Sequence, residues 1–553
     1  MSNVRSVGLG VAALAMLAAA AVFTFAIVFS QFAWYDDEGY LMISIQGLLE
    51  GHTLYKEILT MYGPFYYFYE WFLHGPLALP LNHDVTRALC AIHWLAASSL
   101  LGMTAFRLTR SMPICLFVFM QAVFHLTSLI LEPGHPQEIV VLLLGLAVLV
   151  ATNELGSKWT LRALAAIGAA LVFTKINVGA FYGLALVLAL ACRAGLFQSH
   201  RAWFGLLLLS SSLVPVALMR WNLGEGWARV YAWQSCASVS IAGAVAYCFS
   251  GKKMVSVARI LEVGFIFLSL LLAVLLTLWS LGTSPPFVLN SLVIDASKVS
   301  LKFCIPLKVP FCAWSGLGAV IAAVVVLARK DRLESARPLI IAAKTVYGLL
   351  GGLLLVSDDK AQLGYLLPWA WLLLLPLRPG HKERIPQPFA RTFLCLLAVW
   401  QGLYAYPVAG TQTAVATLPL ILVCSLCLYD SLTALGLEPR ALAILRSLPP
   451  RTPGLAEALI ITSLLYLFAV KWCNPYLAWR DYASLPTAGL PGADHLHIPT
   501  AQVERFRALA SYLSDESDTF ITVPGFNSLY FLANKRPPTY FNFSEAILLS
   551  EDQ

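Results

Sequence analysis

Apolar runs of near-membrane length recur along almost the whole chain, and they constrain its fold more than any other feature. Hydrophobic residues make up 59% of the 553 residues, and the mean hydropathy is +0.74. Only 12% of the residues are charged, compared with roughly 25% in soluble domains. The sequence therefore predicts an all-α polytopic membrane protein, whose helices satisfy their own backbone hydrogen bonds. The basic residues form no aromatic-interleaved block, which argues against a nucleic-acid partner.

The apolar runs, bounded by charged residues or by Gly and Pro, predict about 13–15 transmembrane helices. The first run is too long for a signal-peptide core of roughly 7–15 residues, so we interpret it as an uncleaved helix. The individual runs are 7–33, 86–106, 113–131, 138–153, 161–174, 177–192, 203–219, 230–249, 260–281, 309–328, 338–356, 361–377, 392–406, 413–432 and 455–472.

The distribution of lysine and arginine orients these helices. With the N-terminus in the cytoplasm, far more of the basic residues fall in cytoplasmic loops than in outer loops, as the positive-inside rule predicts. Several unusual polar segments then share the extracytoplasmic face. These segments are 36–38, 132–138, 175–179, 220–229, 357–360 and 406–412.

The predicted first outer loop, 34–85, begins with three adjacent acids, Asp36, Asp37 and Glu38. Charge at the lip of a bilayer is costly and usually functional, and a carboxylate there can act as a general base towards a hydroxyl. An acidic residue at a helix start is also a good N-cap, so both interpretations remain open. Apolar residues at helical spacing after the triplet, and the aromatic run from Pro64, predict two interfacial helices.

The turn Glu132-Pro133-Gly134-His135-Pro136-Gln137-Glu138 is rigid by composition and projects two acids and a histidine. Glu132, His135 and Glu138 are candidate substrate- or phosphate-binding residues, with helix capping as the alternative. A divalent metal held by Asp37, Glu132 and His135 together is compatible with these residue types, although no spacing requires it.

Cations are scarce on the predicted outer face, so those present are candidates for stabilising an anionic leaving group. Aromatic and amide side chains in the outer turns, including a break in the helical pattern at 406–412, complete the candidate binding residues. The set is Lys175, Arg220, Arg229, Lys360, Tyr62, Tyr406 and Gln412.

The composition changes near residue 473, where charged residues become frequent. We predict a membrane domain over 1–472 and a small extracytoplasmic α/β domain over 473–553. Within it, apolar spacing in 501–514 predicts a helix, Phe-Ile-Thr-Val at 520–523 is typical of a strand, and 524–528 of a turn.

The segment YDDEGYLMISIQGLLEGHTLYKE…MYGPFYYF resembles the first outer loop of GT-C-class glycosyltransferases, among them protein O-mannosyltransferases, lipid A aminoarabinose transferases and bacterial relatives. The resemblance is good over 30–110 and extends loosely to 195 through EPGHPQE and FTKINVG. YPVAGTQ and PGFNSLYF…RPPT resemble one bacterial branch, whereas 200–390 matches only in hydropathy.

This resemblance implies a transferase of a bacterial inner membrane that takes a sugar from a polyprenyl-phosphate donor. The acceptor would be a glycan, lipid or protein hydroxyl at the extracytoplasmic face, and no cofactor beyond a divalent metal is implied. The family's catalytic aspartate falls on Asp37, with Glu38 completing its pair and Asp36 as an additional acid. The second acidic site falls on Glu132 or Glu138. A transporter or lipid flippase is the alternative, although paired repeats and broken midplane helices are not evident in the sequence.

Overall fold

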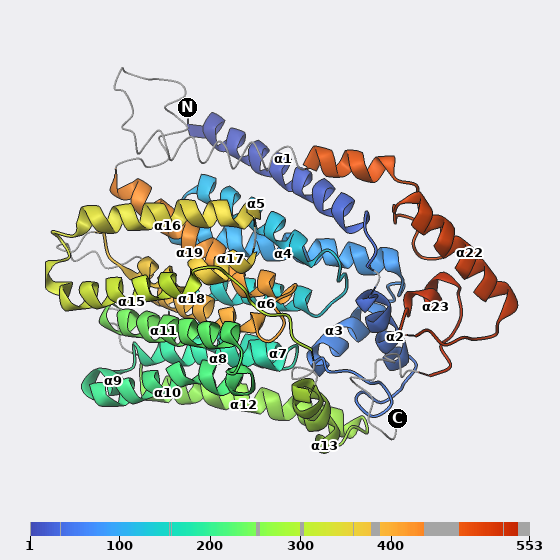
Figure 1. Ribbon diagram of the computed structural model, residues 1–553, viewed down its shortest axis with the longest axis horizontal. Helices are drawn as coiled ribbons and strands as arrows, with labels where there is room; N and C mark the ends of the chain where they lie inside the picture. The colour runs from blue at the N-terminus through green and yellow to red at the C-terminus, as the bar shows by residue number, and fades with distance from the viewer. Residues whose placement is uncertain are drawn as a thin grey trace.

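In the computed structural model, the described part of the chain consists of helices joined by turns and loops (Figure 1). It describes residues 2–33, 35–153, 155, 157–249, 255–298, 303–357, 359–377, 387–435, 475–523 and 525–539. Over these ranges the only β pairing consists of isolated bridges, such as the one between Ile305 and Val408. The all-α prediction is therefore confirmed.

Most of the helices from α4 to α19 lie side by side in one body, and α2, α3 and α23 gather at one end of it (Figure 1). The main packing partners are α4 with α5 and α6, α8 with α18, α10 with α11, and α16 with α19. The helices of this body are α1 (Ser2–Val28), α4 (His83–Thr109), α5 (Met112–Leu126), α6 (Gln137–Ala151), α7 (Lys158–Val172), α8 (Ile176–Ala191), α9 (Gly195–Ser199), α10 (Arg201–Met219), α11 (Gly226–Phe249), α12 (Val257–Ser280), α13 (Pro285–Leu289), α15 (Cys312–Ala328), α16 (Arg337–Ser357), α17 (Asp359–Tyr365), α18 (Pro388–Gln401) and α19 (Gln412–Ala434).

Short non-α turns connect or extend several of these helices. They are η1 (Thr127–Leu129), η2 (Arg220–Asn222), the π-turn η3 (Asn290–Asp295), η4 (Lys330–Arg332), η5 (Leu367–Leu374) and η6 (Gly402–Ala405).

Within the described ranges, six helices are long and apolar enough to cross a membrane, and four shorter apolar helices accompany them. The predicted span 361–377 is not one α-helix, because α17 ends at Tyr365 and the chain continues as the 3₁₀ turn η5. Pro368, near the start of η5, lacks a backbone N–H and cannot continue an α-helical ladder. The predicted span 455–472 and the boundary at 472–473 lie outside the described residues.

Segment 34–85, the predicted first outer loop, contains two helices, as predicted: α2 (Asp37–Leu49) and α3 (Pro64–His74). Helix α2 differs from the expected one-sided amphipathic helix, because every residue from Glu38 to Ile45 is buried. It packs against α3 on one side and against α23 of the C-terminal segment on another. The loop is thus part of the protein interior around its acidic motif.

The described part of the C-terminal segment contains α22 (Thr500–Glu516) and α23 (Ser528–Leu532). The predicted helix at 501–514 is present, but the predicted strand at 520–523 is not: Phe520 stacks on Tyr530, whose hydroxyl donates to the Phe520 carbonyl. No ladder partner exists for these residues in the described chain, so the predicted strand at 520–523 is wrong.

A polar contact fastens the C-terminal segment to the start of α4. The Asp84 carboxylate accepts hydrogen bonds from the backbone N–H groups of Asp494, at 2.9 Å, and His495, at 3.1 Å. The His497 N–H donates to the Phe29 carbonyl at 2.8 Å, just after α1. The segment therefore lies against the same end of the bundle as α2.

Candidate active site

The three adjacent acids have three different environments. Asp36 is the N-cap of α2 and is 2% exposed. Its carboxylate accepts from the Gly39 N–H at 3.0 Å and from the N–H of Ser528, at the start of α23, at 2.7 Å. Burial raises the pKa of Asp36 to about 7, partly offset by the hydrogen bonds from Ser528. Asp36 therefore joins α2 to the C-terminal segment.

Glu38 faces α4 and is held by two basic side chains. Arg87 donates to both carboxylate oxygens, at 3.0 and 2.6 Å, and His83 Nδ1 lies 2.9 Å from Oε1. Burial alone would raise the pKa of Glu38, but Arg87 and His83 outweigh burial and lower it. This geometry orients Glu38 as a buried ion-pair partner.

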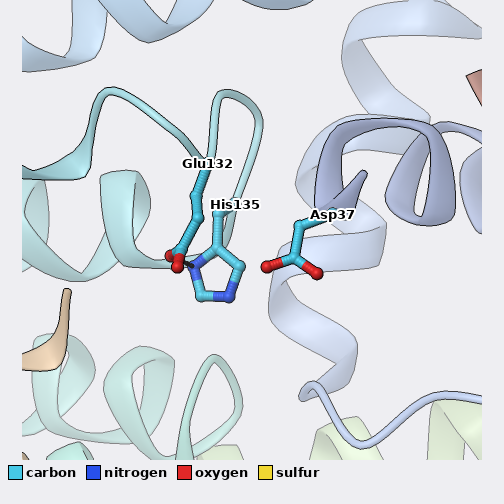
Figure 2. Close-up of side chains that lie close together, drawn as sticks. All are labelled: Asp37, Glu132 and His135. Carbon is cyan, nitrogen blue, oxygen red and sulfur yellow. Dashed lines mark ion pairs between the residues drawn. The ribbon is translucent and has the colours of Figure 1, made fainter. Parts of the chain in front are cut away.

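Asp37, the first residue of α2, points in the third direction, towards Glu132 and His135 in the turn before α6 (Figure 2). One ligating atom from each of the three side chains lies within 4.8 Å of the others. Asp37 and Glu132 are partly exposed and His135 is buried. The fold thus brings these three sequence candidates together.

Two side chains orient Glu132. The Thr411 hydroxyl donates to Glu132 Oε1 at 2.9 Å, and Gln137 Nε2 donates to Oε2 at 2.9 Å. Burial, and then the charge of Asp37, raise the pKa of Glu132 to about 7, while Thr411 and Lys175 act in the opposite direction. Glu132 therefore changes charge near neutral pH beside Asp37.

His135 is a neutral imidazole with both ring nitrogens engaged. Its Nδ1 lies 3.2 Å from the Gln137 N–H and accepts from it, which leaves the ring proton on Nε2. Nε2 lies 2.8 Å from the Tyr62 hydroxyl and donates to it. Burial and the nearby Lys175 charge hold the pKa of His135 well below its usual value.

Lys175, the N-cap of α8, supplies the cation of the site. Its Nζ donates to the Tyr404 hydroxyl at 2.8 Å and lies 5.1 Å from the Tyr62 ring centroid. Burial lowers the pKa of Lys175 to about 8, although the charges of Glu132 and Asp37 act against this shift. A cation therefore borders the two carboxylates.

Tyrosines from the first outer loop brace the 132–138 turn. The Tyr66 hydroxyl donates to the Gly134 carbonyl at 2.8 Å. The Tyr69 hydroxyl lies 2.7 Å from His93, which contacts Glu138 at 3.0 Å, and Glu138 accepts from the Gly134 N–H at 2.7 Å. Glu138, a candidate binding residue by sequence, is thus buried within the scaffold of the turn.

Asp37, Glu132 and His135 provide the oxygen and nitrogen donors that divalent cations use. The two carboxylates fit such an ion directly. His135 would first have to give up its hydrogen bond with Tyr62 or with the Gln137 N–H.

The other sequence candidates occupy separate positions. Arg220 is exposed, donates to the Ala217 carbonyl and lies over the Trp221 ring. Arg229 is exposed and donates to the carbonyls of Leu223 and Gly224. Each arginine thus bonds to carbonyls a few residues away in the sequence.

Three candidates lie around α17 and the start of α19. Lys360 is a partly buried residue of α17, and Tyr406 precedes a cis peptide bond to Pro407. Gln412 is the first residue of α19, directly after Thr411. The sequence pattern singled out 406–412 but missed Thr411, whose hydroxyl makes the contact with Glu132.

A cavity of about 380 Å³ lies beside η6, which carries Tyr404. Its lining is mainly apolar and comes from the N-terminal half of α11, the 307–312 loop and Gly364, with Lys308 as its cation. Tyr231, on the α11 wall, donates a hydrogen bond to the Gly402 carbonyl of η6. One residue of the cavity wall is therefore hydrogen-bonded to the turn that carries Tyr404, the partner of Lys175.

No family model and no curated protein matches this chain. Among solved structures, it is similar to the archaeal oligosaccharyltransferase AglB from Archaeoglobus fulgidus, in complex with an inhibitory peptide and a dolichol-phosphate. The TM-score is 0.41 at 12% identity, and the match covers 96% of this chain and 60% of that chain. At this level of similarity, no residue role transfers from that enzyme.

Proposed function

We propose that this chain is an integral membrane glycosyltransferase. It transfers a sugar from a polyprenyl-phosphate donor to a hydroxyl of a glycan, lipid or protein at the extracytoplasmic face. The observation that carries this proposal is the convergence of Asp37, Glu132 and His135 within 4.8 Å, beside Lys175. These residues come from separate loops that the charge distribution assigns to one side of the membrane.

Asp37 is the proposed general base. A bond forms between the acceptor oxygen and the anomeric carbon while the bond from that carbon to the donor phosphate breaks, with inversion. The acceptor proton passes to Asp37, and the polyprenyl phosphate leaves with its electron pair. Asp37 suits this role because it points towards Glu132 and His135, whereas Asp36 and Glu38 face Ser528 and Arg87.

Lys175 and Glu132 support that step electrostatically. The Lys175 ammonium stabilises the negative charge that develops on the leaving phosphate. An ionised Glu132 favours the charged form of Lys175, because its charge raises the Lys175 pKa against the effect of burial. We assign part of the isoprenoid chain of the donor to the apolar cavity beside η6, whose dimensions fall in the range of small-molecule pockets.

The decisive experiment incubates the purified protein with a panel of polyprenyl-phosphate sugars and membrane-extract acceptors, with and without chelator. Released polyprenyl phosphate is the readout. Asp37→Asn should lower turnover by about 10²–10⁴-fold, with expression and donor binding retained. Asp84→Asn, the same substitution at the contact with the C-terminal segment, is the matched control.

Several outcomes would decide against this assignment. Full turnover by Asp37→Asn would show that another group is the base. Movement of labelled lipid across the membrane without bond cleavage would identify a transporter. Loss of turnover in chelator, restored by a divalent cation, would show that transfer needs a metal ion and would count against Asp37 acting as an unassisted base.

A further inference from the structure

The C-terminal segment makes direct contact with the acidic motif, across 492 positions of sequence. Both carboxylate oxygens of Asp36 are engaged by Ser528, one by its N–H and the other by its hydroxyl. The Asp36 backbone has φ of 50°, in the left-handed region that non-glycine residues rarely adopt. The contact therefore lies at the residue that sets the direction in which α2 begins.

Gly39 shows how closely the two backbones approach. A Cβ at this position would lie 2.1 Å from the Ser528 nitrogen and 2.7 Å from the Asn527 carbonyl carbon. Both are backbone atoms and cannot move aside like a flexible side chain. The sequence therefore needs glycine at 39 for α23 to dock.

Aromatic packing surrounds this polar contact and excludes water from it. The Phe32 ring lies 5.2 Å from Phe506 of α22 and 5.7 Å from Phe526, measured between centroids. Asp36 is 2% exposed and Ser528 is fully buried. A hydrogen bond to a charged group is stronger in such surroundings than at a surface.

We propose that the C-terminal segment is a working part of the active site, and that Asp36, Gly39 and Ser528 are positioning residues for Asp37. This inference rests on the proposed role of Asp37. Asp37 follows Asp36 directly, so any rotation of the Asp36 peptide swings the Asp37 carboxylate relative to Glu132 and His135. A displacement of about 1 Å at a reacting group can cost about 10²-fold in rate.

The test compares kcat and KM for Asp36→Asn, Ser528→Ala and the control Asp84→Asn. Ser528→Ala removes the hydroxyl but keeps the N–H, so it is the milder variant. Asp36→Asn and Ser528→Ala should each lower kcat by about tenfold or more, with KM within about twofold. Asp84→Asn loosens another contact of the same segment with α4 and should leave kcat within about twofold.

Hydrogen–deuterium exchange supplies a readout that does not need turnover. Asp36→Asn and Ser528→Ala should accelerate exchange of the amides in 37–45, whereas Asp84→Asn should accelerate it only in 482–497. If the wild-type protein transfers no sugar, the proposed function fails, yet exchange still decides the inference.

Two outcomes would overturn the proposal that Asp36 and Ser528 position Asp37. The first is unchanged amide exchange in 37–45 for both Asp36→Asn and Ser528→Ala, together with unchanged kcat where turnover exists. This result would show that Asp36 and Ser528 do not position Asp37. An equal loss of kcat in Asp84→Asn shows a general loosening of the segment rather than a specific contact.

Discussion

Replacing Arg87 with methionine tests whether the Glu38 ion pair holds the first outer loop in place. The Arg87 side chain is 1% exposed and donates to both Glu38 oxygens. It also donates to the carbonyls of Val28, at 2.6 Å, and Gln31, at 2.7 Å. Arg87 therefore joins α1, α2 and α4, and methionine would keep part of its stem while removing every one of these donors.

The magnitude follows from burial. Removing one partner of a buried ion pair leaves an uncompensated charge and costs about 3–5 kcal/mol. The chain offers a control of similar chemistry, Arg162, which contacts Glu262 at 2.8 Å through two nitrogens. These side chains are 42% and 34% exposed, so Arg162→Met should cost less than about 1 kcal/mol.

The assay is thermal or denaturant unfolding of the purified variants in one detergent. We expect a large loss of stability for Arg87→Met and almost none for Arg162→Met. The double variant Glu38→Gln/Arg87→Met should recover stability only in part, because Val28 and Gln31 still lose a donor. Equal shifts for Arg87→Met and Arg162→Met would refute the reasoning, since burial would then not set the energy of the pair.

Three further predictions concern the site itself. Gly63→Ala should reduce stability and turnover, because its Cβ would lie 2.0 Å from the Phe173 carbonyl oxygen and displace the turn that carries Lys175. Val230→Trp should raise KM for long-chain donors and spare short-chain ones by filling the cavity. The wild-type rate should fall as pH drops through about 7, where Glu132 takes up a proton. Lys175→Met should move this acidic limb of the pH–rate profile to higher pH, because it removes a charge that lowers the Glu132 pKa.

Each of these has a control within the chain. Gly183→Ala is the control for Gly63→Ala, because a Cβ at 183 meets nothing within 4 Å. Leu261→Trp, at a site 67% exposed on α12, controls for the added bulk at Val230. A pH limb that stays in place in Lys175→Met, measured on residual turnover, would contradict the coupling of Lys175 with Glu132.

Hydropathy and charge distribution predicted that these loops share one side of the membrane, but not which of them meet. Asp37, Glu132 and Lys175 follow the first, third and fifth predicted spans, and loops after odd-numbered spans lie on one side of a membrane. That parity argument needs no side-chain geometry, and the structure brings these three residues together. The spacing of the tyrosines in this segment was also visible in the sequence, because Tyr62, Tyr66 and Tyr69 recur at helical intervals. An aromatic run equally suits a headgroup belt, however, so the spacing alone did not separate the two interpretations.

The separate environments of Asp36, Asp37 and Glu38 follow from helix geometry. At 3.6 residues per turn, adjacent helical residues point about 100° apart, so Asp37 and Glu38 face different neighbours, whereas Asp36 precedes the helix as its N-cap. The partners themselves were beyond sequence reasoning. No periodicity links Asp36 to Ser528, and the contact depends on a close backbone approach at Gly39.

The charges of the site also bear on how it would receive its substrate. Burial places the pKa of Glu132 near 7 and that of Lys175 near 8, so at neutral pH a small change in local potential alters both. A donor phosphate adds negative charge, which favours the charged form of Lys175, and that charge in turn lowers the pKa of Glu132. Departure of the polyprenyl phosphate reverses this effect. Burial of Lys175 beside the two carboxylates thus lets the site accept an anion without a fixed excess of positive charge.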